Sequence, residues 1–136
     1  MLDTDVITAA VRSPNGASKR LLDWLFNDAI QAVISVPLAL EYEAVLTRPK
    51  HLKASGLSFE EMSLLLDTII SKMHPVEVHY LWRPLLSDVS DEMVLETAIN
   101  GHATTIVTFN IKHFSAVTTL GLEVLTPGDA LKRIIL

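Results

Sequence analysis

The chain has 136 residues, of which 49% are hydrophobic and 20% charged, and its formal net charge is -5. This balance excludes a disordered chain, which combines low hydrophobicity with high net charge. Five glycines and six prolines exclude a collagen-like or low-complexity protein. The absence of cysteine excludes disulfides and thiolate metal sites. The length is that of one compact domain, so we expect residues 1–136 to form a single domain.

No segment of the sequence has the character of a membrane span or a signal peptide. The apolar stretch Val33–Leu40 is interrupted by Ser35 and Pro37, whereas a span needs about 20 apolar residues. The first residues lack a basic region followed by an apolar one, so we expect a cytoplasmic protein without membrane contact. The acidic balance argues against a protein that coats duplex nucleic acid. It is compatible with a metal-dependent nuclease, because a bound cation reverses the local field.

Short apolar runs alternate with amphipathic stretches, a pattern typical of an α/β domain with a parallel sheet. The predicted strands are Met1–Leu2 with an extension toward Val6, Ala32–Ser35, Val76–Tyr80, Thr105–Thr108 and Glu123–Leu125. The predicted helices are residues 17–28, 37–48, 58–70, 91–100 and 126–134. Loops are expected at residues 13–16, 50–57 and 81–90. The pattern predicts one three-layer α/β/α domain with a central, mainly parallel sheet.

Acidic and amide side chains follow the predicted strands. Asp3 comes directly after the first strand, and Asp5 lies on the same side of an extended segment. Asn110 comes two residues after a later strand. Glu41 lies one turn into a helix, and Asp91 begins another. Because ligands bind outside the carboxyl ends of the strands in such sheets, we expect these side chains to share one edge.

Carboxylates gathered at one edge repel one another unless a cation neutralises them. Mg²⁺ and Mn²⁺ suit oxygen ligands and keep several waters. Such an ion can activate water and stabilise the charge that develops on a phosphate. The set therefore indicates hydrolysis of phosphodiester bonds.

Each of these residues also has an ordinary structural interpretation. Asp3 with Asp5 can form a polar turn, Asp91 can cap a helix, and Asn110 can be a turn residue. Isolated charges are more often solvated, as we expect for Glu41 taken alone, Glu43, Asp88 and Glu92. Five basic residues can flank a groove for RNA phosphates, although scattered surface charge is the default: Lys19, Arg20, Arg48, Lys50 and Lys53.

Histidines and tryptophans give weaker signals. None of the five histidines shows a metal-binding spacing. His113 lies near the predicted edge, where a surface histidine is the ordinary interpretation. Trp24 and Trp82 are better explained as packing or interface residues than as platforms for bases.

Four motifs in order along the chain resemble the PIN-domain family. They are Leu2-Asp3-Thr4-Asp5-Val6, Glu41–Leu46 followed by Arg48-Pro49-Lys50, Asp91-x-x-Val94-Leu95-x-x-Ala98, and Ile106–Phe114. The tail Val124-Leu125-Thr126-Pro127 is similar to one branch, the toxin components of toxin–antitoxin pairs known as VapC-type toxins. The resemblance covers essentially the whole chain.

This resemblance implies a metal-dependent endoribonuclease with an RNA substrate. It assigns Asp3, Glu41 and Asp91 to binding Mg²⁺ or Mn²⁺ and positioning the attacking water. Asn110 takes the place of a fourth acid, which makes it the fourth catalytic position. Asp5 and Thr108 are implied as supporting residues, Thr108 through hydrogen bonding. The resemblance also implies self-association, with a homodimer expected, and a cognate antitoxin as partner.

The sequence departs from the family pattern at two places. Asn110 replaces an Asp, and His113 stands where a further Asp is common, so we expect at most one firmly held ion. Only Met1 and Leu2 precede the first acid. We therefore expect a misassigned start, a shortened chain or a truncated strand that weakens the sheet.

Two other classes of function stay open beside the nuclease. The first is a catalytically weakened RNA- or protein-binding regulatory module on the same fold, which Asn110 and the short first strand favour. The second is a receiver-like phosphoacceptor domain. It ranks lower, because the strands Val33–Ser35 and Val76–Tyr80 end without the Asp that such a domain needs.

Overall fold

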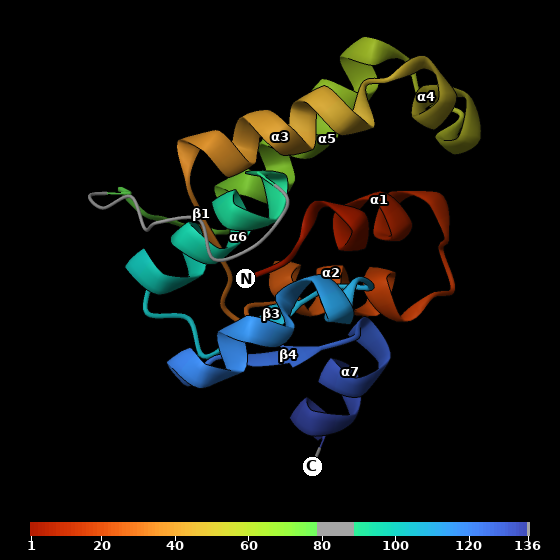
Figure 1. Ribbon diagram of the computed structural model, residues 1–136. Helices are drawn as coiled ribbons and strands as arrows, with labels where there is room; N and C mark the ends of the chain where they lie inside the picture. Colours follow the sequence, from red (N-terminus) through yellow and green to blue (C-terminus); the bar gives the residue numbers. More distant parts are fainter. Residues whose placement is uncertain (79–88, 136) are drawn as a thin grey trace.

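The computed structural model describes residues 1–78 and 89–135. Its helices are α1 (Thr4–Arg12), α2 (Ala17–Phe26), α3 (Val36–Leu46), α4 (Pro49–Ser55), α5 (Phe59–Ser71), α6 (Val89–Asn100), the 3₁₀ helix η1 (Ile111–Leu120) and α7 (Pro127–Ile135). Its strands are β1 (Val33–Ile34), β2 (His74–Pro75), β3 (Thr105–Val107) and β4 (Glu123–Leu125). Figure 1 shows these elements in space.

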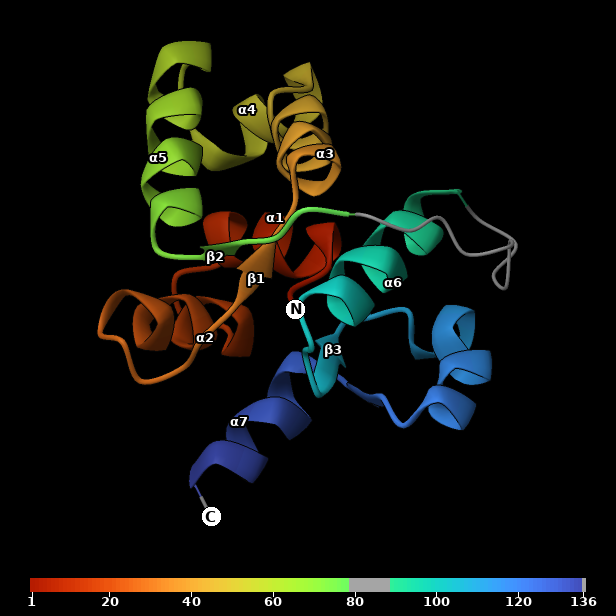
Figure 2. The ribbon, with the colours of Figure 1, turned by 90° about the vertical axis from the view of Figure 1, so that its left-hand side faces the viewer.

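The strands pair in parallel, as the sequence predicts for an α/β domain. β1 pairs with β2, β3 pairs with β4, and Leu2 forms an isolated parallel bridge with Val107. Within residues 1–78 and 89–135 this gives two separate two-stranded sheets, and the single central sheet expected for three layers is not seen there. Figure 2 shows the N-terminus between β1 and β3. The first segment contributes only one bridge because helix α1 begins directly after Asp3.

The start of α1 corrects the strand expected to extend toward Val6. Asp3 has extended backbone angles and its Oδ1 accepts a hydrogen bond from the Thr4 amide at 2.8 Å, so it caps the helix. Val6 and Ile7 lie on the buried side of that helix. Asp5 therefore occupies the first helical turn and is not on the same side of an extended strand as Asp3.

Helix α4 occupies most of the predicted connection at residues 50–57. Pro49 begins this helix, since the missing amide of proline costs nothing in a first turn. Gly56 ends it in the left-handed region at φ 74°. η1 was likewise not predicted, and it ends at Gly121 with φ 80°.

The end of α5 is followed by a strand two residues earlier than expected. Strand β2 is His74–Pro75, whereas the prediction was Val76–Tyr80. Residues 76–78 carry no strand, and residues 79 and 80 lie outside the described residues, as do Trp82 and Asp88. The capping box of Ser58 and Glu61 is confirmed by both of its hydrogen bonds.

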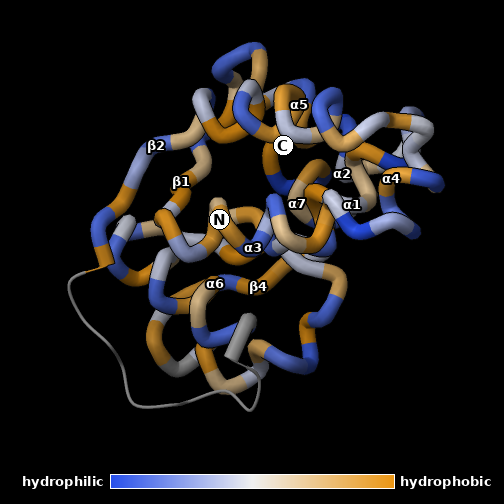
Figure 3. The backbone as a smooth tube through the Cα atoms, turned by 90° about the horizontal axis from the view of Figure 1, so that it is seen from above, coloured by the Kyte–Doolittle hydropathy of each residue, from blue (hydrophilic) through white to orange (hydrophobic). Residues whose placement is uncertain are grey.

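A continuous apolar core joins the helices to the short strands. Its largest fully buried side chains include Tyr42 of α3 and Phe114 of η1. Gly101 allows the end of α6 to approach β1 and the residue after β2, because a Cβ there would lie 3.0 Å from Val33 Cγ1 and 2.9 Å from Val76 Cγ2. Apolar and polar residues alternate along the helices (Figure 3), as expected where one side of each helix is buried. No helix among the described residues has the length and apolar character that a membrane crossing requires.

Candidate metal-binding and catalytic site

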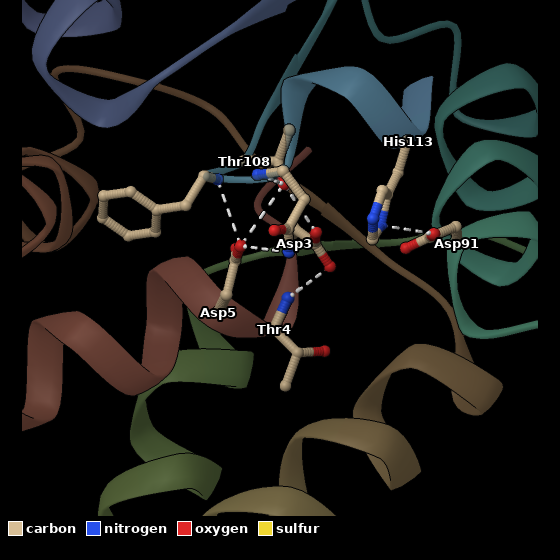
Figure 4. A network of polar contacts seen from close by, with 8 residues as sticks. Asp3, Thr4, Asp5, Asp91, Thr108 and His113 are labelled. Carbon is tan, nitrogen blue, oxygen red and sulfur yellow. Dashed lines mark hydrogen bonds and ion pairs between the residues drawn. The ribbon is translucent and has the colours of Figure 1, made fainter. Parts of the chain in front are cut away.

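The first acid and the end of β3 meet because the chain start pairs with that strand. The Asp3 amide donates to the Val107 carbonyl at 3.0 Å, and the Val107 amide donates to the Met1 carbonyl at 2.9 Å. Thr108 follows β3 and is fully buried. Its Oγ1 donates to Asp3 Oδ2 at 2.8 Å and lies 3.4 Å from Asp5 Oδ2 (Figure 4). The two segments thus bring Asp3, Asp5 and Thr108 together at one sheet edge.

Asp5 receives further hydrogen bonds from the residues after Thr108. Its Oδ2 accepts from the Phe109 amide and from Asn110 Nδ2, each at 3.1 Å. The Asn110 amide in turn donates to Thr108 Oγ1 at 3.0 Å. The other oxygen, Asp5 Oδ1, is buried and has no hydrogen-bond partner within residues 1–78 and 89–135. Asp5 therefore has one oxygen that accepts several hydrogen bonds and one that accepts none from that part of the chain.

Two negative charges lie close together in this network. Burial, and next the charge of Asp3, raise the pKa of Asp5 from 3.8 to about 6, although the hydrogen bonds from Phe109 and Thr108 and the neighbouring Val6 amide oppose the shift. The network therefore holds Asp5 in a place where its charged form is disfavoured.

Tyr42 contacts the chain start directly before this network, a contact that was not predicted from the sequence. It is fully buried, and its hydroxyl donates to the Leu2 carbonyl. Burial, followed by the charges of Asp3 and Asp5, raises the pKa of Tyr42. Its neighbour Glu41 was the candidate in that motif. A tyrosine next to an acid in α3 was the available signal, but a tyrosine that only packs in the core would show the same pattern.

A second pair lies across α6 and η1. His113 Nδ1 is 3.1 Å from Asp91 Oδ2, and the Asp91 side chain is 12% exposed against 56% for His113 (Figure 4). Asp91 stands in the first turn of α6, which favours its charge. His113 was expected near the predicted edge, where its ordinary interpretation was a surface histidine, and its position three residues after Asn110 was the signal for this contact.

The predicted site residues thus fall into three groups. Asp3, Asp5, Thr108 and Asn110 share one network, and Asp91 pairs with His113. Glu41 is half-buried on α3 and makes no hydrogen bond or ion pair with another described residue. In the described part of the chain, no three His, Asp or Glu side chains are close enough together to hold a metal ion. The role of Glu41 as a metal ligand stays a prediction.

The acid network nevertheless fits a divalent cation. It offers oxygen atoms, which Mg²⁺ and Mn²⁺ prefer. The buried Asp5 Oδ1 accepts no hydrogen bond from the described residues, and a cation would satisfy it. Positive charge there would also offset the repulsion between Asp3 and Asp5 that contributes to the raised pKa.

The chain matches the family model described as the PIN domain over residues 1–112, and it belongs to that family. PIN domains are in general metal-dependent nucleases. Comparison with curated proteins and with solved structures finds no match. The family thus agrees with the chemistry that an acidic network at a sheet edge can support.

Proposed function

We propose that this protein is a metal-dependent endoribonuclease that hydrolyses RNA phosphodiester bonds. One observation carries the proposal: the carboxylates of Asp3 and Asp5 lie together beside the end of β3, and a buried oxygen of Asp5 has no hydrogen-bond partner among the described residues. Paired carboxylates that disfavour their own charges are the usual setting for a cation. Membership of the PIN-domain family supports the same activity.

In this proposal Asp3, Glu41 and Asp91 hold Mg²⁺ or Mn²⁺, and Asp5 is the supporting acid whose charge the bound ion would offset. When bound, such an ion activates water and stabilises the charge that develops on the phosphate. Thr108 keeps Asp3 oriented through the hydrogen bond to Oδ2. Asn110 holds Asp5 through its amide nitrogen, which leaves the Asn110 oxygen as a further polar atom beside the substrate.

The test is cleavage of total RNA with Mn²⁺ or Mg²⁺, with EDTA as the metal-free control. Asp3→Asn and Asp91→Asn should each slow cleavage at least 100-fold, the scale of losing a preorganised electrostatic group. Asn also caps helices well, so Asp3→Asn should keep the start of α1 folded. Asp67→Asn is the matched control, because Asp67 is an exposed acid of α5. Undiminished cleavage by both site variants would contradict the assignment.

We further propose that the protein is the toxin component of a toxin–antitoxin pair and works as a homodimer. The motifs Glu41–Leu46 and Val124–Pro127, which resemble that branch of the family, support this. Induced expression should stop growth of a bacterial host, whereas Asp3→Asn should not, and co-expression of a cognate antitoxin should restore growth. Light scattering of the purified protein gives its oligomeric state. Unchanged growth at an expression level that yields active nuclease would contradict the toxin role.

A catalytically weakened RNA- or protein-binding regulatory module is the second candidate. Two observations favour it. The described residues include no group of three metal-ligating side chains, and the Asn110 side-chain amide donates its hydrogen bond to Asp5. It predicts RNA or protein binding that is unchanged by EDTA, with no cleavage under any divalent metal. Metal-dependent fragments that are absent with Asp3→Asn would eliminate it.

A further inference from the structure

The end of α1 opposite the acid network carries a basic surface. Arg12 lies in the last turn of α1, Arg48 is the N-cap of α4, and Lys50 lies in the first turn of α4. The three side chains are exposed. α4 packs against α1 and lies beside its C-terminal half (Figure 1). The packing of these two helices gathers cations that are far apart in the sequence.

No carboxylate in the described part of the chain neutralises these three cations. In residues 1–78 and 89–135, none of them has a carboxylate oxygen within 4.0 Å. By contrast, Lys72 pairs with Asp28, and Arg133 pairs with Glu123. On a chain of net charge -5, this corner is locally positive.

His51 lies among the three cations and reports their combined field. His51 is 8% exposed, and its Nδ1 is buried without a hydrogen-bond partner among the residues that the structure describes. Burial and then the charges of Lys50, Arg12 and Arg48 lower its pKa. Positive groups that repel one another at a fixed place are stabilised when an anion binds between them.

We propose that Arg12, Arg48 and Lys50 form a surface that binds the phosphate backbone of single-stranded RNA. The inference rests on the proposed function, because it assigns a binding surface to a further part of the same RNA substrate, outside the acid network. Arg12 follows Asp5 by seven residues on one helix, which is about 10 Å along the axis. An RNA strand with one phosphate at the acid network can therefore place another, a few nucleotides away, on this surface. Arginine suits that role because its guanidinium donates two parallel hydrogen bonds to a phosphate.

Binding can be measured separately from cleavage. The protein carrying Asp3→Asn is titrated in EDTA against a fluorescent single-stranded RNA of 20 nucleotides, and anisotropy is followed over a range of salt concentrations. In that background, Arg48→Gln with Lys50→Gln should weaken binding about tenfold at low salt. The slope of log affinity against log salt should fall by about 1.4, since each phosphate contact to a single strand contributes about 0.7.

The matched control is Lys72→Gln with Arg133→Gln, which removes the same charge from two ion pairs elsewhere. It should change the affinity less than twofold, and circular dichroism should show both double variants folded. Equal loss in both double variants, no loss in either, or no RNA binding by the parent protein would overturn the surface. Tighter binding of polyglutamate than of RNA would overturn it in favour of an acidic protein partner. RNA binding through this surface without any cleavage by the unmodified protein would refute the nuclease and leave the surface intact.

Discussion

The two ends of helix α1 carry opposite charges in opposite surroundings. At its start, Asp3 and Asp5 are tied by hydrogen bonds to the segment after β3. At its end, the exposed Arg12 lies beside the basic start of α4. Both signs agree with the helix dipole, which favours anions at the N-terminus and cations at the C-terminus.

The two ends differ in how far their charged groups are exposed to water. The acids are partly removed from water, so their charges need hydrogen bonds or a counter-ion, and they influence the stability of the fold. The cations keep their hydration, so they influence their neighbours mainly through their field. Substitutions at the acid end should therefore change stability, whereas substitutions at the basic end should change pKa values and RNA affinity.

The largest effect on stability is expected for Thr108→Val. Its hydroxyl is fully buried, donates to Asp3 Oδ2 and accepts from the Asn110 amide. Valine has the same shape but neither function, so the free energy of unfolding should fall by about 2 kcal/mol. Urea denaturation in EDTA measures the change.

Thr68→Val is the control for that change. Thr68 is exposed on α5 and its hydroxyl donates only to the Leu64 carbonyl of its own helix. Its substitution should cost less than about 0.5 kcal/mol. Equal effects of the two substitutions would show that the Thr108 network does not hold the acid end in place.

A smaller effect of opposite sign is expected for Asp5→Asn. The raised pKa of Asp5, about 6 against 3.8, means that the folded protein binds a proton more tightly than the unfolded chain does. Stability is therefore lost as the pH rises from about 4 through 6. At pH 7.5 without metal, Asp5→Asn should stabilise the protein by about 1 kcal/mol, a figure reduced from the full shift because the group is partly solvated.

The pH dependence provides the control for Asp5→Asn. The gain in stability over the unmodified protein should disappear as the pH falls below about 4, because the Asp5 carboxyl then becomes neutral in both the folded protein and the unfolded chain. Saturating Mn²⁺ should reverse the order at pH 7.5, since a ligand that binds the folded state stabilises it. A variant that is less stable at every pH would mean that the hydrogen bonds to Asp5 outweigh its burial.

The sequence allows much of the acid end to be predicted and little of the basic end. Asp3 and Asn110 each follow a predicted strand, and parallel strands end at one edge, so their approach follows from the pattern. The capping role of Asp3 was not predicted, because an Asp after an apolar pair is equally typical of a strand end. His113 was expected near this edge, but its pairing with Asp91 was not predicted, because that contact depends on how η1 packs beside α6.

The basic end depends on tertiary packing. Arg12 and Arg48 both act on His51 because α4 packs against α1, whereas residues 50–57 were predicted to form a loop. The single central sheet was expected from the alternation of apolar runs. That pattern predicts where strands lie but not how many backbone hydrogen bonds join neighbouring strands. The first segment is joined to β3 by only one bridge, at Leu2.

The smallest effect on stability is expected for Lys50→Gln, where the change should appear in the pKa of His51. Lys50 is the strongest of the three charges that lower this pKa, so its removal should raise the value toward the ordinary one. NMR titration at low salt measures that rise, and 1 M salt should shrink it, because the screening length falls to about 3 Å. The free energy of unfolding should change by less than about 0.5 kcal/mol, as for most exposed substitutions. Lys72→Gln removes a charge that has no part in lowering the pKa of His51 and should leave it unchanged. If Lys50→Gln does not raise the pKa, the cations at the end of α1 act singly, and the contrast between the two ends of the helix loses its electrostatic basis.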